Sequence, residues 1–156
     1  MINLKEKPFY LDDKGCEWVK NTLAGMDDKA KVGQLFCEIL WDRPGSEPES
    51  LFDFIEPGGV MYRPFPGKKM HEFSKRLQAK AKIPLLVACN LERGGSGGNG
   101  GLTDGTYVSS PMGCAATDDP QTAYELATVA CREGGAGGAN WTFEPIIDID
   151  MNPENP

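Results

Sequence analysis

The sequence predicts an α/β fold built on a parallel sheet. Three observations support this. Short apolar runs alternate with amphipathic helical stretches, and each strand-helix unit takes roughly thirty residues or more, as right-handed crossovers require. The run 83–89 is apolar on both faces, which suits an inner strand of a parallel sheet. A closed (β/α)8 barrel needs about 250 residues, so a chain of 156 residues allows either a small open sheet or roughly the first half of a barrel.

Two helices are expected near the N-terminus. Asp12 and Asp13 can cap a first packing helix that ends at Gly25. A second helix is expected behind Asp27 and Asp28, because apolar residues follow at spacings of three and four and predict a stripe toward the core: Val32, Leu35, Phe36, Ile39 and Leu40. The last part of this stretch, 35–41, can equally be a strand. Proline, glycine and charged residues predict a loop over 42–50.

The middle of the chain supplies two strands and two helices. Residues 58–62 form a short buried strand opened by glycines, and 83–89 form the inner strand. A helix over 67–82 has one apolar side, made of Met70, Phe73, Leu77 and Ala81. A second helix starts at Asp118-Asp-Pro120, with proline in its first turn, and ends in the glycines of 134–138.

The C-terminal stretch predicts the edge of a ligand site. Trp141 to Ile149 is typical of a buried strand, and the polar run from Asp148, broken by Pro153, then leaves it. Ligands of parallel α/β folds bind at the carboxyl ends of the strands. We expect some residues of this site to lie beyond Pro156.

Composition narrows the class of protein. The net charge is −7, which argues against a broad nucleic-acid surface, since such a surface needs clustered Lys and Arg. The start of the chain has no apolar signal region and no apolar run approaches about 18 residues, so no membrane association and a cytoplasmic location are expected. The number of cysteines is odd, and their wide spacing predicts reduced core thiols: Cys16, Cys37, Cys89, Cys114 and Cys131.

No cofactor or metal ion is expected. Gly95, Gly97 and Gly100 satisfy the G-x-G-x-x-G pattern of dinucleotide sites, but Leu102-Thr-Asp-Gly-Thr is not a helix start that could hold a pyrophosphate. A flexible pocket loop is the preferred interpretation, with a nucleotide-binding module as the alternative. Asp148, Asp150 and Asn152 imitate a calcium loop that lacks its glycine, and no cysteine and histidine spacing makes a zinc site.

Five blocks of the chain, taken in order, resemble glycoside hydrolase family 3. They are Asp28-Lys-Ala-Lys-Val-Gly-Gln-Leu-Phe36, Gly58-Gly-Val-Met-Tyr62, Ile83-Pro-Leu-Leu-Val-Ala88, Cys114-Ala-Ala-Thr-Asp-Asp-Pro120, and Asn140-Trp-Thr-Phe-Glu-Pro-Ile-Ile-Asp148 with Asn152-Pro-Glu-Asn-Pro156. The resemblance implies that residues 1–156 are a truncated N-terminal part of the family's barrel domain. The fold implied is a partial (β/α)8 TIM barrel: the first three to four β/α units, with parallel strands and outer helices.

The resemblance also implies an activity. Members of the family are retaining exo-β-glycosidases, and the segment 90–101 is closest to a β-N-acetylhexosaminidase branch that removes terminal β-linked sugars. The reaction needs a nucleophile and a proton donor on either side of the glycosidic bond. The family's aspartate nucleophile and its acid lie on later strands, so no catalytic residue is transferred and the chain is expected to be inactive alone. The lone His71 is expected to be a solvated helix residue.

What the resemblance transfers is a set of candidate sugar-binding residues. The family block Asp-Gln-Glu-Gly-Gly corresponds to Asn90-Leu-Glu-Arg-Gly-Gly95, which is one residue longer, so the sugar-gripping position is either Asn90 or Glu92. Arg93 is a further candidate, unless it forms a surface ion pair with Glu92. Asp148 matches a different aspartate of the family, the one that ends the block Pro145-Ile-Ile-Asp148, with a loop-capping carboxylate as the alternative. Asp150 is the weakest candidate.

The partner expected from the resemblance is a carbohydrate substrate. The alternative function is a non-catalytic carbohydrate-binding module or a half-barrel that associates with itself, because an open parallel sheet exposes edge amides and apolar surface.

Overall fold

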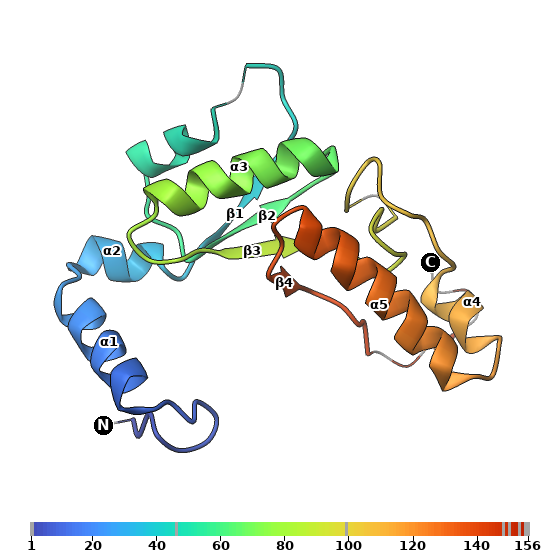
Figure 1. Cartoon of the computed structure of the whole chain (residues 1–156), viewed down its shortest axis with the longest axis horizontal. Coiled ribbons are helices and arrows are strands. Elements are labelled where there is room, and N and C mark those ends of the chain that lie inside the picture. The colour runs from blue at the N-terminus through green and yellow to red at the C-terminus, as the bar shows by residue number, and fades with distance from the viewer. Residues whose placement is uncertain are drawn as a thin grey trace.

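The computed structural model describes residues 2–45, 47–98 and 100–147, together with residues 149, 151, 152 and 154. Its centre is a parallel sheet whose strand order follows the chain, β1-β2-β3-β4 (Figure 1). The strands are β1 (Cys37–Leu40), β2 (Gly59–Tyr62), β3 (Leu86–Cys89) and β4 (Trp141–Thr142). Parallel neighbours in sequential order are the arrangement of the first half of a (β/α)8 barrel, so the predicted fold class is confirmed.

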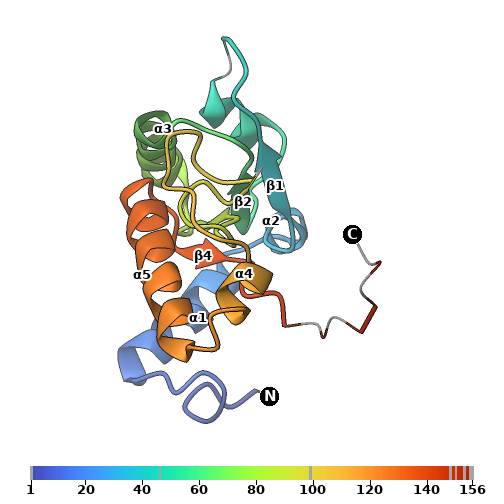
Figure 2. The ribbon, with the colours of Figure 1, turned by 90° about the vertical axis from the view of Figure 1, so that its right-hand side faces the viewer.

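The helices are α1 (Asp13–Ala24), α2 (Asp28–Gly33), η1 (Pro48–Asp53), α3 (Gly67–Lys80), α4 (Pro111–Ala115) and α5 (Pro120–Ala136). The two long helices that follow β2 and β3, α3 and α5, lie on the same side of the sheet (Figures 1 and 2). The expected outer helices are therefore present. Aspartate side chains cap α1, α2 and α5 as predicted, since Asp12, Asp27 and Asp119 each accept a first-turn N–H.

The core lies between the sheet and these two helices. Val60 and Tyr62 of β2 and Val87 of β3 pack against helix residues that the sequence placed on the apolar side, Met70, Phe73 and Leu77, with Ala130 of α5 beside them. Alternation along a strand then directs the residues in between to the other face. On that face Ile39 and Leu86 remain 47% and 51% exposed. The sheet thus has one buried and one partly open face.

Two sequence predictions at the N-terminal side are wrong. The second helix ends at Gly33, and the alternative strand interpretation of 35–41 holds, because β1 pairs with β2 there. Val32 and Leu35 do not face a core and are 54% and 84% exposed. In α1, Trp18 is also more than half exposed. Periodicity alone cannot show whether a second surface is present to cover an apolar stripe.

The terminal strand is much shorter than predicted. Of the described residues after Asn140, only Trp141 and Thr142 pair with β3, opposite Ala88 and Cys89. At Asn90 the chain of β3 turns into the glycine-rich loop, so the tail after Thr142 has no neighbour to continue the ladder. Pro145 also has no N–H to donate. The described apolar residues after Thr142 are exposed instead of buried: Phe143, Ile146, Ile147, Ile149 and Met151.

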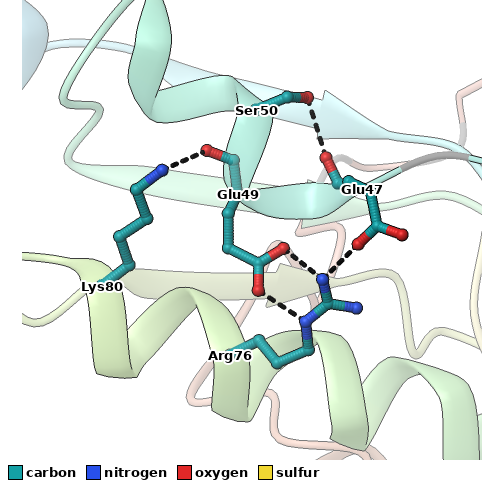
Figure 3. A network of polar contacts seen from close by, with 5 residues as sticks. All are labelled: Glu47, Glu49, Ser50, Arg76 and Lys80. Atoms are coloured by element: carbon teal, nitrogen blue, oxygen red, sulfur yellow. Dashed lines mark hydrogen bonds and ion pairs between the residues drawn. The ribbon is translucent and has the colours of Figure 1, made fainter.

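Two short elements, η1 and α4, were not predicted, and η1 is fastened to α3 by a polar network (Figure 3). The guanidinium of Arg76 donates two hydrogen bonds to Glu49, at 2.5 and 2.6 Å, and also contacts Glu47. Lys80 Nζ donates to the backbone oxygen of Glu49 at 3.1 Å. The network fixes the crossover between β1 and β2, although its exposed position limits its contribution to stability.

All five cysteines are free thiols, as expected, but two of them are not in the core. Cys16, Cys89 and Cys114 are buried, whereas Cys37 and Cys131 are exposed. Burial raises the pKa of the Cys89 thiol to about 11, which keeps this thiol protonated and unreactive.

Asn140 fastens the start of β4 to β3. Its side-chain oxygen accepts from Val87 N–H at 2.7 Å, and its Nδ2 donates to Leu85 O at 3.1 Å. Replacing Asn140 by Ala is expected to lower the free energy of unfolding by about 1 kcal/mol, because the buried N–H of Val87 loses its acceptor. Denaturant titration measures the change, with the exposed Asn21→Ala as the control. Equal stability of the two variants would contradict this role.

Candidate functional site

The carboxyl ends of the four strands bring one residue from each to the same edge of the sheet. The register pairs Leu40, Tyr62, Cys89 and Thr142 across the sheet, so the residues that follow them also line up: Trp41, Arg63, Asn90 and Phe143. The ladder still holds at this point, because Arg63 N–H donates to Leu40 O at 2.9 Å. The site predicted at this edge therefore draws side chains from all four strands.

Asn90 is held by a glycine-rich loop that folds back over it. Leu102 N–H donates to Gly95 O at 2.8 Å, which closes the loop. A Cβ at Gly100 would lie 2.7 Å from Asn90 Cβ, and one at Gly97, whose φ is +54°, would lie 2.0 Å from Asn90 O. Only glycine fits these two positions. The Asn90 side chain is thereby fixed with its Oδ1 buried and without a hydrogen-bond partner among the described residues.

The outer part of this loop is tied to α5 and to itself. Glu133 of α5 accepts from Thr106 N–H at 2.7 Å and from its hydroxyl at 2.5 Å. Arg93 donates to the hydroxyl of Tyr107 at 2.8 Å. In the described part of the chain no ion pair joins Arg93 to Glu92, so the predicted alternative of a surface ion pair between them is wrong. Glu92 interacts with Glu144 instead.

Glu92 and Glu144 come together from adjacent strands. Glu92 lies three residues after β3 and Glu144 two residues after β4, and both line a largely apolar groove of about 640 Å³ between α4, α5 and the tail after β4. One oxygen of each carboxyl is buried without a hydrogen-bond partner in the described residues. Burial, and then the neighbouring charge and hydrogen bond of Glu92, raise the pKa of Glu144 to about 7. The Glu144 carboxyl is therefore partly protonated near neutral pH.

The remaining predicted residues have different outcomes. Asp148 and Asp150 lie outside the described residues, so the proposed calcium-like loop does too. His71 is exposed on α3, as predicted, with its Nδ1 3.0 Å from Ala136 O. Sequence analysis missed Arg63, although its place directly after the predicted strand 58–62 was a usable signal. It also missed Glu144, which stood inside the predicted strand 141–149.

The geometry disfavours a dinucleotide site at the glycine-rich loop. Among the described residues, no helix starts behind the glycine-rich loop until Pro111, so the helix N-terminus that would hold a pyrophosphate is missing there. Within the described residues, no group of three or more His, Cys, Asp and Glu side chains could hold a metal ion. In the same part of the chain, no helix is long and apolar enough to cross a membrane.

The profile of the glycosyl hydrolase family 3 N terminal domain matches residues 57–156, a range that starts just before β2 and includes every candidate residue. The chain belongs to this family. The predicted resemblance is therefore confirmed, and the open four-stranded parallel sheet is consistent with half of a (β/α)8 barrel. The matched range also includes Glu144, although the resemblance by itself did not single this residue out.

One curated relative and two solved structures are similar to this chain over nearly its whole length. A curated relative from Cellulomonas fimi, named "Beta-N-acetylglucosaminidase/beta-glucosidase", is 42% identical over 159 residues, which is 100% of this chain and 27% of the relative. A solved structure titled "Beta-glucoside phosphorylase BglX bound to 2FGlc" is 60% identical with a TM-score of 0.94, and the match covers 98% of this chain and 27% of the chain in that structure. A second structure, titled "Beta-glucoside phosphorylase BglX", is 57% identical with a TM-score of 0.87, covering 98% and 26%. The chain thus spans about a quarter of the length of each relative.

Proposed function

We propose that residues 1–156 form the sugar-holding front part of a barrel domain in an enzyme that processes terminal β-linked glycosides. One observation supports this above all: at the carboxyl edge of the sheet, Asn90 Oδ1 and Glu92 Oε2 are buried acceptors without a partner among the described residues. An unpartnered buried acceptor costs free energy unless a ligand supplies the donor. Sugar hydroxyls are such donors, and Asn90 and Glu92 are the positions that align with the family's sugar-gripping block.

The proposed reaction is retaining exo-glycosidase chemistry of the β-N-acetylhexosaminidase type. It passes through an ester on an aspartate, with a second group that protonates the leaving oxygen. Neither group is assigned to this chain, which we propose to be inactive alone. Asp148, Asp150 and Arg93 remain proposed sugar-binding residues, and Arg93 would contact sugar from its position beside Tyr107. No cofactor is assigned. A cytoplasmic location is also proposed, because the five free thiols fit a reducing compartment.

The proposal is tested with the full-length protein that contains this chain and with chromogenic β-N-acetylglucosaminides and β-glucosides. The full-length protein is expected to turn them over, and Glu92→Ala is expected to lower kcat/KM about 10- to 100-fold, since a hydrogen bond to a charged group is lost. Glu72→Ala is the control, because it removes an exposed carboxylate on α3. Turnover by residues 1–156 alone that Asp148→Asn abolishes would overturn the assignment of inactivity.

A second candidate activity is transfer of the sugar to phosphate instead of water. Two relatives that share more than half of their aligned residues with this chain are titled as β-glucoside phosphorylases. The same sugar-holding residues would serve both reactions, because only the acceptor differs. Release of a sugar 1-phosphate from the chromogenic substrate in phosphate buffer distinguishes this reaction from hydrolysis.

The non-catalytic alternative is self-association of the half-barrel. Ile39, Leu86 and Trp141 on the partly open face of the sheet are between 37% and 51% exposed, which supports it. Light scattering that gives a monomer for residues 1–156 would remove this alternative.

A further inference from the structure

Arg63 is placed at the same edge of the sheet as Asn90, but on a different strand. It directly follows β2, which lies between β1 and β3 (Figure 1). Tyr62 pairs with Leu40 on one side and with Cys89 on the other, and the N–H of Arg63 extends this ladder to Leu40 O. The backbone of Arg63 is therefore part of the sheet, at the position level with Asn90.

Alternation along β2 decides which face Arg63 is on. Val60 and Tyr62 are fully buried against α3, and Tyr62 accepts a hydrogen bond there from Ser74 at 3.2 Å. Side chains of a strand alternate between the two faces, so Arg63 shares the opposite face with Met61. That face has no long helix packed on it, and at its carboxyl end the family's sugar site is proposed. Arg63 is half-buried there.

The guanidinium of Arg63 differs in its partners from those of Arg76 and Arg93. Arg76 is bound by Glu47 and Glu49, and Arg93 by Tyr107. The Arg63 guanidinium makes no hydrogen bond or ion pair with any residue in the ranges that the structure describes. A half-buried guanidinium with five free N–H donors at a ligand edge is suited to bind acceptor oxygens.

We propose that Arg63 is a further substrate-binding residue, which donates hydrogen bonds to hydroxyl oxygens of the terminal sugar. The inference rests on the proposed function and extends it to a residue that neither the sequence analysis nor the comparisons singled out. The chemistry is complementary: Asn90 Oδ1 and Glu92 Oε2 offer acceptors, while Arg63 offers donors from the neighbouring strand. A sugar hydroxyl can donate to one group and accept from the other at once.

The test compares Arg63→Met, Arg63→Lys and the control Arg132→Met in the full-length protein. Arg132 is exposed on α5 and its guanidinium has no hydrogen bond or ion pair within the described residues, so it is a matched arginine away from the edge. For Arg63→Met we expect kcat/KM on the chromogenic glycoside to fall about 10- to 100-fold, while Arg132→Met remains within twofold of the wild type. Arg63→Lys, which keeps the charge but not the planar fork of donors, should recover only part of the loss.

Deoxy-sugar glycosides identify the contact. On a glycoside that lacks the hydroxyl bound by Arg63, wild type and Arg63→Met should have the same kcat/KM, a result that a purely structural role would not produce. An Arg63→Met variant with wild-type Tm and unchanged kcat/KM on the complete sugar would overturn the inference. If Arg63→Met does not fold, Arg63→Lys decides in the same way, by its kcat/KM at wild-type Tm. A wild-type protein that turns over no β-glycoside would instead overturn the proposed function.

Discussion

Replacing Phe65 by Ala is expected to lower the free energy of unfolding by about 3–5 kcal/mol. Phe65 is fully buried, and its ring meets those of Tyr62 and Phe73 edge-to-face, with centroids 4.9 and 5.6 Å apart. Truncation removes the buried apolar surface of the ring and both ring contacts, and it leaves a cavity between β2 and α3. Denaturant titration followed by circular dichroism measures the loss.

The effect of Phe65→Ala should reach the functional edge as well. The backbone of Phe65 accepts from Thr103 N–H at 2.8 Å and donates to Gly101 O at 3.3 Å, so it anchors the end of the glycine-rich loop. Phe54→Ala is the matched control, because Phe54 is 79% exposed and its truncation should change stability by less than about 0.5 kcal/mol. A loss below about 1 kcal/mol for Phe65→Ala would mean that the Phe65 ring is not packed against Tyr62 and Phe73 in solution.

Raising the pH from 5 to 8 is expected to destabilise the protein at the Glu92 and Glu144 pair by about 1–2 kcal/mol, after allowance for solvent screening. The folded-state pKa of Glu144 is raised to about 7, above the usual value of a glutamate. The folded state then binds more protons than the unfolded state between these two values. Stability consequently falls as the pH rises toward about 7, because Glu144 then ionises in a partly buried position beside Glu92. Glu144→Gln keeps the shape and removes the second charge.

The measurement is the free energy of unfolding of wild type and Glu144→Gln at pH 5, 6, 7 and 8. We expect the variant to be flatter with pH and more stable than wild type at pH 8, and to lie close to it at pH 5. Glu72→Gln controls for the removal of one exposed carboxylate. Parallel pH curves for wild type and Glu144→Gln would show that the pKa of Glu144 is not raised in the folded state.

Much of the fold was set by local sequence. Asp12, Asp27 and Asp119 cap their helices through contacts with residues two or three positions away, so the helix starts were predictable. The doubly apolar run 83–89 predicted an inner parallel strand, and β3 lies between β2 and β4. The five family blocks likewise predicted the barrel class, because each block corresponds to one strand or helix start.

Long-range contacts decided what the sequence could not. Arg93 pairs with Tyr107, and Glu92 meets Glu144, fifty-two positions further along the chain. The strand after Asn140 ends at Thr142 because its neighbour β3 ends at Cys89, a limit that is invisible in the apolar run up to Ile149.

The sequence by itself determined the helix caps, the parallel α/β class, the family and the segment 90–93 as a candidate sugar contact. These depend on neighbours along the chain and on side-chain type. Only the tertiary structure decided which side chains at the carboxyl edge have partners and which do not. Partners at that edge are supplied by other strands and by the folded glycine-rich loop, so the free acceptors of Asn90 and Glu92 and the free donors of Arg63 emerge only when the strands lie side by side.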